Sequence, residues 1–184
     1  NSANRRGFHY LVDLLRKKFI TPTIVAFGQV ASAMPEELLK SCPGLDLAMI
    51  GEFEDTVFEL VEKNRYWMSI KGIPGTVYRN WGKIARSPSR QPVEDIDSLV
   101  KPKDNLAGYS MASSRGCGES CNFCGTPSYL GKKVRRHSVD YLLDLAAYQV
   151  TRKRCAIDFT DRDFARDKRR VLDFCAGLKA RSLN

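Results

Sequence analysis

The apolar residues of this chain recur first at the spacing of a helix and then as a short continuous run. Between residues 8 and 19 they fall three or four positions apart, as on one face of an amphipathic helix. The members of this face are Phe8, Leu11, Val12, Leu15 and Phe19. Pro22 stops the pattern, and the apolar run over residues 23–27, which ends at Gly28, predicts a buried strand.

The alternation of helix and strand continues to residue 63. Pro35 begins a short helix whose first turn is acidic, as the positive end of a helix dipole favours. Residues 45–51 predict a second strand, and residues 54–63 predict a helix. The apolar face of that helix holds Val57, Phe58 and Val61. Elements in this order indicate a parallel sheet covered by helices.

After residue 70 the pattern changes to a hairpin, a linker and a second alternating stretch. Residues 76–86, around Asn80-Trp81-Gly82, predict a hairpin. Residues 87–105 carry three prolines and many charges, which predicts an extended linker. Beyond it we expect a strand over 109–114, a helix capped by Ser138, a strand over 155–160 and a final helix marked by Val171, Leu172, Cys175 and Leu178. This order is that of two βα units.

Composition limits the class of protein. The 184 residues are 43% apolar, which supports a packed core and excludes wholesale disorder. Because no run of about 18 uncharged apolar residues occurs, we expect no membrane span. The net charge of +9 suits an anionic partner, but the basic residues are scattered. The first residues include neither Met nor an apolar leader, so we expect part of a longer cytoplasmic protein with reduced thiols.

Three of the six cysteines carry candidate chemistry. Cys117, Cys121 and Cys124 are spaced C-x3-C-x2-C among Gly, Glu, Ser and Asn residues, which make a poor core. Soft thiolates select zinc, copper(I) or iron–sulfur clusters. The other three, Cys42, Cys155 and Cys175, are isolated in apolar surroundings, so we expect them to be unpaired core residues.

The spacing leaves three interpretations open. A cubane iron–sulfur cluster on three thiolates keeps one iron free for a ligand. A structural zinc ion needs four protein ligands, and it would recruit His137 or Cys42 as the fourth. Cys121 and Cys124 would otherwise act alone as a redox pair. The glycines around the motif suit a loop that bends closely around an inorganic core.

The motif resembles the signature of the radical S-adenosylmethionine superfamily, C-x3-C-x-aromatic-C after the first barrel strand, with Phe123 as the aromatic residue. This resemblance implies a [4Fe-4S] cluster on Cys117, Cys121 and Cys124. S-adenosylmethionine would chelate the open iron, and one electron from a donor such as flavodoxin or ferredoxin would cleave it to a 5′-deoxyadenosyl radical. The backbone beside Phe123 would lie near the adenine.

Further segments resemble the superfamily's subgroup with an N-terminal cobalamin-binding domain. Residues 131–138 resemble its basic stretch after the cluster loop, and residues 159–164 resemble its F-x-D-D-x-F segment. Asp161 falls on the first acid, which implies a contact with S-adenosylmethionine, whereas Arg162 replaces the second. The alternative role for Asp161 is a cap or turn before the final helix.

Upstream segments extend the resemblance over almost the whole chain. Residues 26–37 resemble G-G-x-H-x-x-x-x-P-E-E, residues 51–60 resemble G-E-G-E-x-T-x-x-E-L, and residues 73–79 and 95–99 resemble the interdomain hairpin and linker. The resemblance implies cobalamin binding with Gly28, Gly51 and Glu52 as candidate contacts. Gln29, Ala31 and Phe53 depart from the subgroup's pattern, and the chain contains no D-x-H-x-x-G loop.

The implied fold class is α/β: the end of a Rossmann-like, cobalamin-binding-type domain, followed by the first two βα units of a radical SAM partial TIM barrel. The implied boundaries are residues 1–70, a hairpin and linker over 71–107, and the barrel part over 108–184. Because the family's barrel has six units, two units leave a sheet edge and a helix face uncovered. We therefore expect a fragment or a chain that packs against something else.

The implied function is radical cleavage of S-adenosylmethionine for methylation, rearrangement or cyclisation of a small-molecule or lipid-like substrate. One alternative is a tRNA methylthiotransferase, whose RNA phosphates would suit the basic pairs Lys132-Lys133 and Arg135-Arg136. The simpler interpretation of those pairs is a solvated basic loop. A second alternative is a zinc-binding module that contacts nucleic acid without catalysis.

Overall fold

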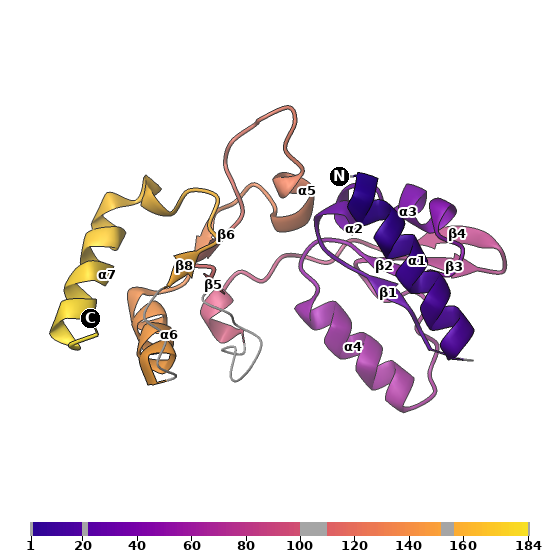
Figure 1. Cartoon of the computed structure of the whole chain (residues 1–184), viewed down its shortest axis with the longest axis horizontal. Helices are drawn as coiled ribbons and strands as arrows, with labels where there is room; N and C mark the ends of the chain where they lie inside the picture. The colour runs from indigo at the N-terminus through magenta and orange to yellow at the C-terminus, as the bar shows by residue number, and fades with distance from the viewer. Residues whose placement is uncertain (1, 20–21, 100–109, 152–156, 184) are drawn as a thin grey trace. The chain divides into compact units, whose positions relative to one another are not determined.

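The structure, a computed structural model, describes residues 2–19, 22–99, 110–151 and 157–183 and divides into two units (Figure 1). The first unit contains residues 1–92 together with 120–131, and the second contains residues 93–119 together with 132–184. Each unit has its own strand pairing and its own hydrophobic core. The predicted core residue Cys155 lies outside the described residues.

The first unit is built on a mixed sheet with the strand order β1-β2-β3-β4. Strands β1 (Val25–Ala26) and β2 (Leu47–Met49) are parallel, as the alternation of helix and strand predicts. Strand β3 (Thr76–Asn80) pairs antiparallel with β2 and forms the predicted hairpin with β4 (Lys83–Arg86). The hairpin therefore extends the sheet of the first unit.

Four helices surround this sheet: α1 (Ser2–Lys18), α2 (Gln29–Ala33), α3 (Pro35–Ser41) and α4 (Glu54–Arg65). Helix α1 lies across the sheet in Figure 1, and its Val12 joins the core formed with Ala26, Ala48 and Val77. The apolar pattern did not predict α2, because Val30 is the only large apolar residue in its five positions and no helical pattern arises.

The predicted helix over residues 54–63 is present as α4, and much of its apolar face is exposed. Phe58 is 70% exposed and Val61 is 54% exposed. The fully buried residue of this helix is Thr56, whose hydroxyl donates a 3.5 Å hydrogen bond to the carbonyl of Pro74. The side of α4 that carries Thr56 therefore faces the turn before β3, whereas Phe58 and Val61 are exposed.

The second unit contains the predicted βα pair. Strands β5 (Ser110–Met111) and β8 (Asp158–Phe159) are parallel, with Met111 opposite Phe159. Strands β6 (Ser114–Arg115) and β7 (Arg135–Arg136) form a separate antiparallel pair. The remaining elements are the helices α6 (Val139–Thr151) and α7 (Lys168–Ala180) and the short 3₁₀ helices η1 (Ile96–Ser98) and η2 (Phe164–Arg166).

Helices α6 and α7 pack closely against each other (Figure 1). A Cβ atom at Gly177 of α7 would lie 2.4 Å from Cδ1 of Leu143 on α6, so any larger residue there would force the Leu143 side chain to move. The inward face of α7 follows Phe174 and Leu178, which turns Cys175 outward. The predicted core position of Cys175 is therefore wrong, whereas Cys42 is buried in the first core as predicted.

Among the residues described, none of the helices is both long enough and apolar enough to span a membrane.

Candidate functional site

The cysteine loop leaves β6 and returns through β7, so one antiparallel strand pair closes both of its ends. Ser114 lies opposite Arg136, and Arg115 lies opposite Arg135. Gly116 begins the loop with a φ of +93°, and a Cβ atom there would lie 2.1 Å from the carbonyl oxygen of Lys133. Only glycine fits this position. The close bend expected from the sequence is therefore present at Gly116.

The three cysteines of the loop form no disulfide and have different surroundings. Cys121 is exposed, whereas Cys117 and Cys124 are partly buried. The backbone NH of Cys124 donates a 3.1 Å hydrogen bond to the carbonyl of Cys121, which forms a tight turn between these two residues. Phe123 within this turn is 93% exposed. Three thiols outside any disulfide are the kind of donor set that a soft metal or an iron–sulfur cluster needs.

No three His, Cys, Asp or Glu side chains among the described residues converge closely enough to hold a metal ion. Ligation of a cluster by Cys117, Cys121 and Cys124 therefore stays a prediction. The two residues considered as a fourth zinc ligand are occupied elsewhere. The Nδ1 atom of His137 pairs with Oδ1 of Asp97 at 2.7 Å, and the Cys42 thiol is buried in the first core, where burial raises its pKa.

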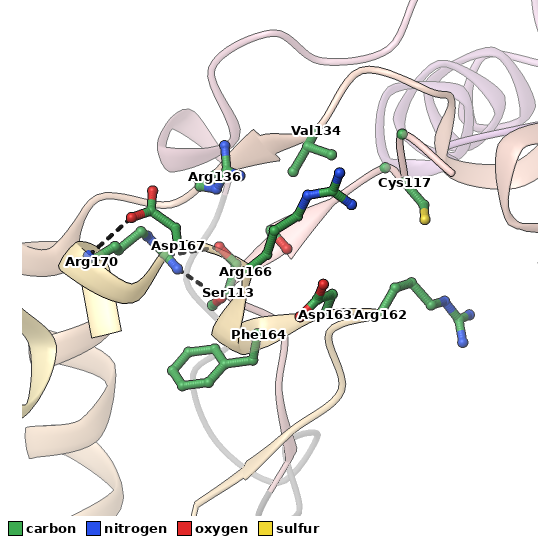
Figure 2. Close-up of a pocket in the computed structure, with 13 residues that line it drawn as sticks. Ser113, Cys117, Val134, Arg136, Arg162, Asp163, Phe164, Arg166, Asp167 and Arg170 are labelled. Atoms are coloured by element: carbon green, nitrogen blue, oxygen red, sulfur yellow. Dashed lines mark hydrogen bonds between the residues drawn. The ribbon is translucent and has the colours of Figure 1, made fainter. Parts of the chain in front are cut away.

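The second unit contains a pocket beside Cys117, at the carboxyl ends of β5 and β8 (Figure 2). Four arginines line it: Arg136, Arg162, Arg166 and Arg170. The acidic lining residues are Asp163 and Asp167, so the side chains of the pocket carry a net positive charge. Such a pocket attracts a ligand that bears a carboxylate or phosphate group.

The four arginines are not equivalent. Arg170 donates hydrogen bonds to Ser113 Oγ and O, both at 3.0 Å, and to the carbonyl of His137 at 2.9 Å. The Nε atom of Arg170 is buried without a hydrogen-bond partner in the described residues. Burial lowers the pKa of the Arg170 guanidinium. Arg166 forms an ion pair with Glu119. Arg162, which the sequence analysis noted only as a departure from the F-x-D-D-x-F pattern, is exposed and lines the pocket.

Asp161 holds two strand ends together. Its Oδ2 accepts a 2.8 Å hydrogen bond from the Ser113 amide, and its Oδ1 accepts hydrogen bonds from the hydroxyls of Ser113 and Ser114. The segment after β8 is thereby tied to the segment after β5. Asp167, rather than Asp161, caps α7 by accepting from the Arg170 amide at 3.2 Å. The contact of Asp161 with S-adenosylmethionine stays a prediction.

The candidate cobalamin residues lie at the carboxyl ends of two adjacent parallel strands. Gly28 follows β1 with a φ of +102°, and Gly51 follows β2 with a φ of +75°. The Ser32 hydroxyl joins them: it donates to the Gly28 carbonyl and accepts from the Gly51 amide, both at 2.9 Å. Sequence reasoning missed Ser32, for which the only signal is a small polar residue one turn after Gly28. Glu52 directly follows this bridge.

An apolar surface accompanies these strand ends. The rings of Phe27 and Phe53 lie with their centroids 4.5 Å apart. Phe27, Val30 and Met34 are each more than half exposed. Ligands of α/β sheets bind outside the carboxyl ends of the strands. The first unit therefore presents a polar bridge and an apolar surface at the place where a large ligand of such a sheet would bind.

No protein-family model matches the chain, but relatives and solved structures do. This chain is 29% identical over 175 residues to an uncharacterized methyltransferase of Pyrococcus horikoshii. The aligned region covers 88% of this chain and 38% of the relative. It is also 26% identical over 146 residues to the tRNA-2-methylthio-N(6)-dimethylallyladenosine synthase of Psychromonas ingrahamii. That aligned region covers 78% of this chain and 28% of the relative. The chain thus spans well under half the length of these relatives.

Two solved enzymes share the fold. The radical S-adenosylmethionine methyltransferase TsrM from Kitasatospora setae, with tryptophan and a SAM analog bound, matches 95% of this chain and 36% of its own, with a TM-score of 0.74 and 17% identity. The cobalamin-dependent S-adenosylmethionine radical enzyme OxsB matches 97% of this chain and 27% of its own, with a TM-score of 0.73 and 18% identity. The predicted fold class is confirmed.

Proposed function

We propose that this chain is part of a radical S-adenosylmethionine enzyme whose [4Fe-4S] cluster is held by Cys117, Cys121 and Cys124. The observation that carries the proposal is the C-x3-C-x2-C loop, which follows the first strand of a parallel βα pair and whose Cys117 lines an arginine-rich pocket. When bound, the reduced cluster would supply the electron that cleaves S-adenosylmethionine to methionine and a 5′-deoxyadenosyl radical.

The pocket beside Cys117 would hold the methionine end of S-adenosylmethionine. Arg162 is exposed there and would neutralise the carboxylate, while Asp163 would balance the amino group or the sulfonium. Asp161 and Arg170 would act indirectly, because their hydrogen bonds to Ser113 keep the two strand ends in place. Phe123 would contribute its backbone near the adenine.

We infer that the first unit contributes to a cobalamin site and that the reaction is a methylation. Gly28, Gly51 and Glu52 would meet the cofactor at the strand ends, with Ser32 fixing the two glycine turns. The exposed apolar surface of Phe27, Val30 and Met34 suits a large, flat macrocycle. The similarity to a curated methyltransferase favours methylation over rearrangement or cyclisation, with a small-molecule substrate and an electron donor such as flavodoxin or ferredoxin.

A tRNA methylthiotransferase is the second candidate, because the matched relatives include a tRNA-2-methylthio-N(6)-dimethylallyladenosine synthase and a putative methylthiotransferase of Methanocaldococcus jannaschii. The basic loop gives it little support. Lys133 is paired with Glu94, and the buried Arg135 donates to the carbonyl of Val93 at 2.6 Å. Two of the four basic residues that would meet RNA phosphates are therefore engaged within the second unit. Titration with a tRNA anticodon stem-loop at two salt concentrations would test this candidate.

Anaerobic reconstitution with iron and sulfide tests the main proposal. We expect about four irons per chain, a broad brown absorption and, with dithionite and S-adenosylmethionine, release of 5′-deoxyadenosine. Cys121→Ala should abolish the colour. Cys175→Ala is the matched control, since it removes another exposed thiol outside the loop, and it should retain the cluster. One tightly bound zinc ion without absorption would reject the proposal in favour of a zinc module.

A further inference from the structure

Directly after the last cysteine of the loop, a buried hydroxyl contacts its sulfur. Thr126 begins the short helix α5 (Thr126–Leu130) and is only 1% exposed. The Cys124 Sγ atom donates a hydrogen bond to Thr126 Oγ1 over 3.2 Å. The two other cysteines are placed differently, since Cys121 is exposed and Cys117 borders the arginine-lined pocket. Cys124 is thus paired with a buried hydroxyl of its own loop.

Packing within the first unit fixes this hydroxyl. Helix α5 lies against α2, and a Cβ atom at Gly125 would come within 2.9 Å of the Gln29 amide nitrogen. At the other end of α5, the carbonyl oxygen of Tyr129 lies 3.7 Å from the position of a Cβ atom on Gly51. The segment that carries Thr126 therefore rests on α2 and near the end of β2, and the hydroxyl is held beside Cys124.

Binding of iron would reverse the direction of this hydrogen bond. A thiol gives up its proton when its sulfur binds a metal, so Cys124 could no longer donate. The Thr126 hydroxyl would then turn its own hydrogen toward the sulfur, which is a better acceptor as a thiolate. A buried hydroxyl left without a partner is costly, so the pair favours this arrangement. The proton of the thiol leaves to solvent, and the hydroxyl keeps its hydrogen.

We propose that Thr126 is a positioning residue of the cluster site, which donates a hydrogen bond to the Cys124 sulfur and raises the reduction potential of the cluster. The inference rests on the proposed function. Hydrogen bonds to cluster sulfurs stabilise the reduced state, which carries one more negative charge. Thr126 would therefore make the electron that starts the reaction easier to place on the cluster, without touching the cosubstrate.

The test compares three forms of the full chain after anaerobic reconstitution: wild type, Thr126→Val and Thr126→Ser. Valine keeps the shape of threonine and removes the hydroxyl, while serine keeps the hydroxyl and removes the methyl group. The midpoint potential of the cluster is measured by redox titration with electron paramagnetic resonance detection. We expect a shift to a more negative potential in Thr126→Val and a potential near that of wild type in Thr126→Ser.

The outcomes separate this inference from the proposed function. A wild-type chain that binds no cluster rejects the proposed function and the inference with it. A cluster whose potential is unchanged in Thr126→Val rejects the inference alone. Equal shifts in Thr126→Val and Thr126→Ser also reject it, because the cause would then be packing. If Thr126→Val prevents cluster assembly, Thr126→Ser decides the outcome. A wild-type potential and iron content in Thr126→Ser support the proposed role of the hydroxyl, whereas a shifted potential in Thr126→Ser rejects that role.

Discussion

The imidazole of His137 and the carboxylate of Asp97 lie 2.7 Å apart, and they join the linker to the segment between β7 and α6. The ring also stacks on Tyr141, with centroids 4.0 Å apart. Burial lowers the pKa of His137, and this effect outweighs Asp97, which acts to raise it. Arg115 and Arg170 further disfavour the protonated ring. The second unit therefore holds His137 neutral.

We expect this pair to make the stability of the chain sensitive to mild acid. Because the pKa of His137 is lower in the folded chain than its ordinary value of 6.5, the unfolded chain binds a proton first as the pH falls. The contribution of His137 to the free energy of unfolding should be fully present above pH 6.5. It should decrease as the pH falls from that value toward the pKa of His137 in the folded chain. Thermal unfolding between pH 8 and pH 5 would measure this, and His137→Asn should flatten the decrease. An equally steep decrease in the variant would contradict the assignment.

The bend at Gly116 is predicted to be essential for the cysteine loop. Gly116→Ala combines a strained φ of +93° with an atom 2.1 Å from the backbone of Lys133. The strain alone costs about 1–3 kcal/mol, so we expect a lower unfolding temperature and a loss of iron binding. The matched control is Gly118→Ala, where the added Cβ atom would lie 4.0 Å from the carbonyl oxygen of Lys132, its nearest neighbour beyond the adjacent residues. If both variants bind iron equally well, the bend is not required.

Arg162→Ala is predicted to weaken binding of S-adenosylmethionine without destabilising the fold. The side chain is exposed and lines the pocket beside Cys117, so its removal takes away a charge and no packing. We expect roughly tenfold weaker binding in equilibrium dialysis, the loss of one charge-assisted contact. Arg169→Ala removes another exposed arginine, which does not line the pocket, and should bind as wild type does. Equal affinities of both variants would remove Arg162 from the site.

Val30→Glu is predicted to reduce cobalamin binding. Val30 is 59% exposed on the apolar surface beside Gly28, so a carboxylate is tolerated by the fold but would meet an apolar ligand face. We expect about tenfold weaker binding of hydroxocobalamin by equilibrium dialysis. Val61→Glu is the matched control, because Val61 is similarly exposed at 54% but lies on α4. Cobalamin bound equally by both variants would place the ligand elsewhere.

Local patterns predicted the kinds of element more reliably than their orientation. Helix α1 and the parallel pair β1–β2 follow from apolar spacing and from the rhythm of the chain. Phe58 shows the limit of such patterns, because they identify the apolar face of α4 without showing what it packs against. The buried face is the one that carries Thr56, whose hydroxyl donates to the carbonyl of Pro74. Cys175 was misplaced for the same reason.

Part of the candidate site could likewise be predicted from the sequence, and part could not. The chemistry of Cys117, Cys121 and Cys124 is readable from the sequence, because a chelating motif lies within eight consecutive residues. The pocket beside Cys117 is not readable, since Arg136, Arg162 and Arg170 come from separate segments and only the pairing of strands brings them together. The Ser32 bridge and the contact between Thr126 and Cys124 likewise carry no sequence signature.

By itself, the sequence determined the longer helices, the parallel strand pairs β1–β2 and β5–β8, the hairpin and the identity of the candidate cluster ligands. These depend on the periodicity and spacing of neighbouring residues, which the backbone geometry of helices, strands and tight loops converts directly into structure. Only the tertiary structure decided that Asp161 ties two strand ends, that His137 pairs with Asp97, and that the arginines share one pocket. Those contacts join residues far apart in the chain, and packing of the whole unit selects among the partners that local patterns leave open.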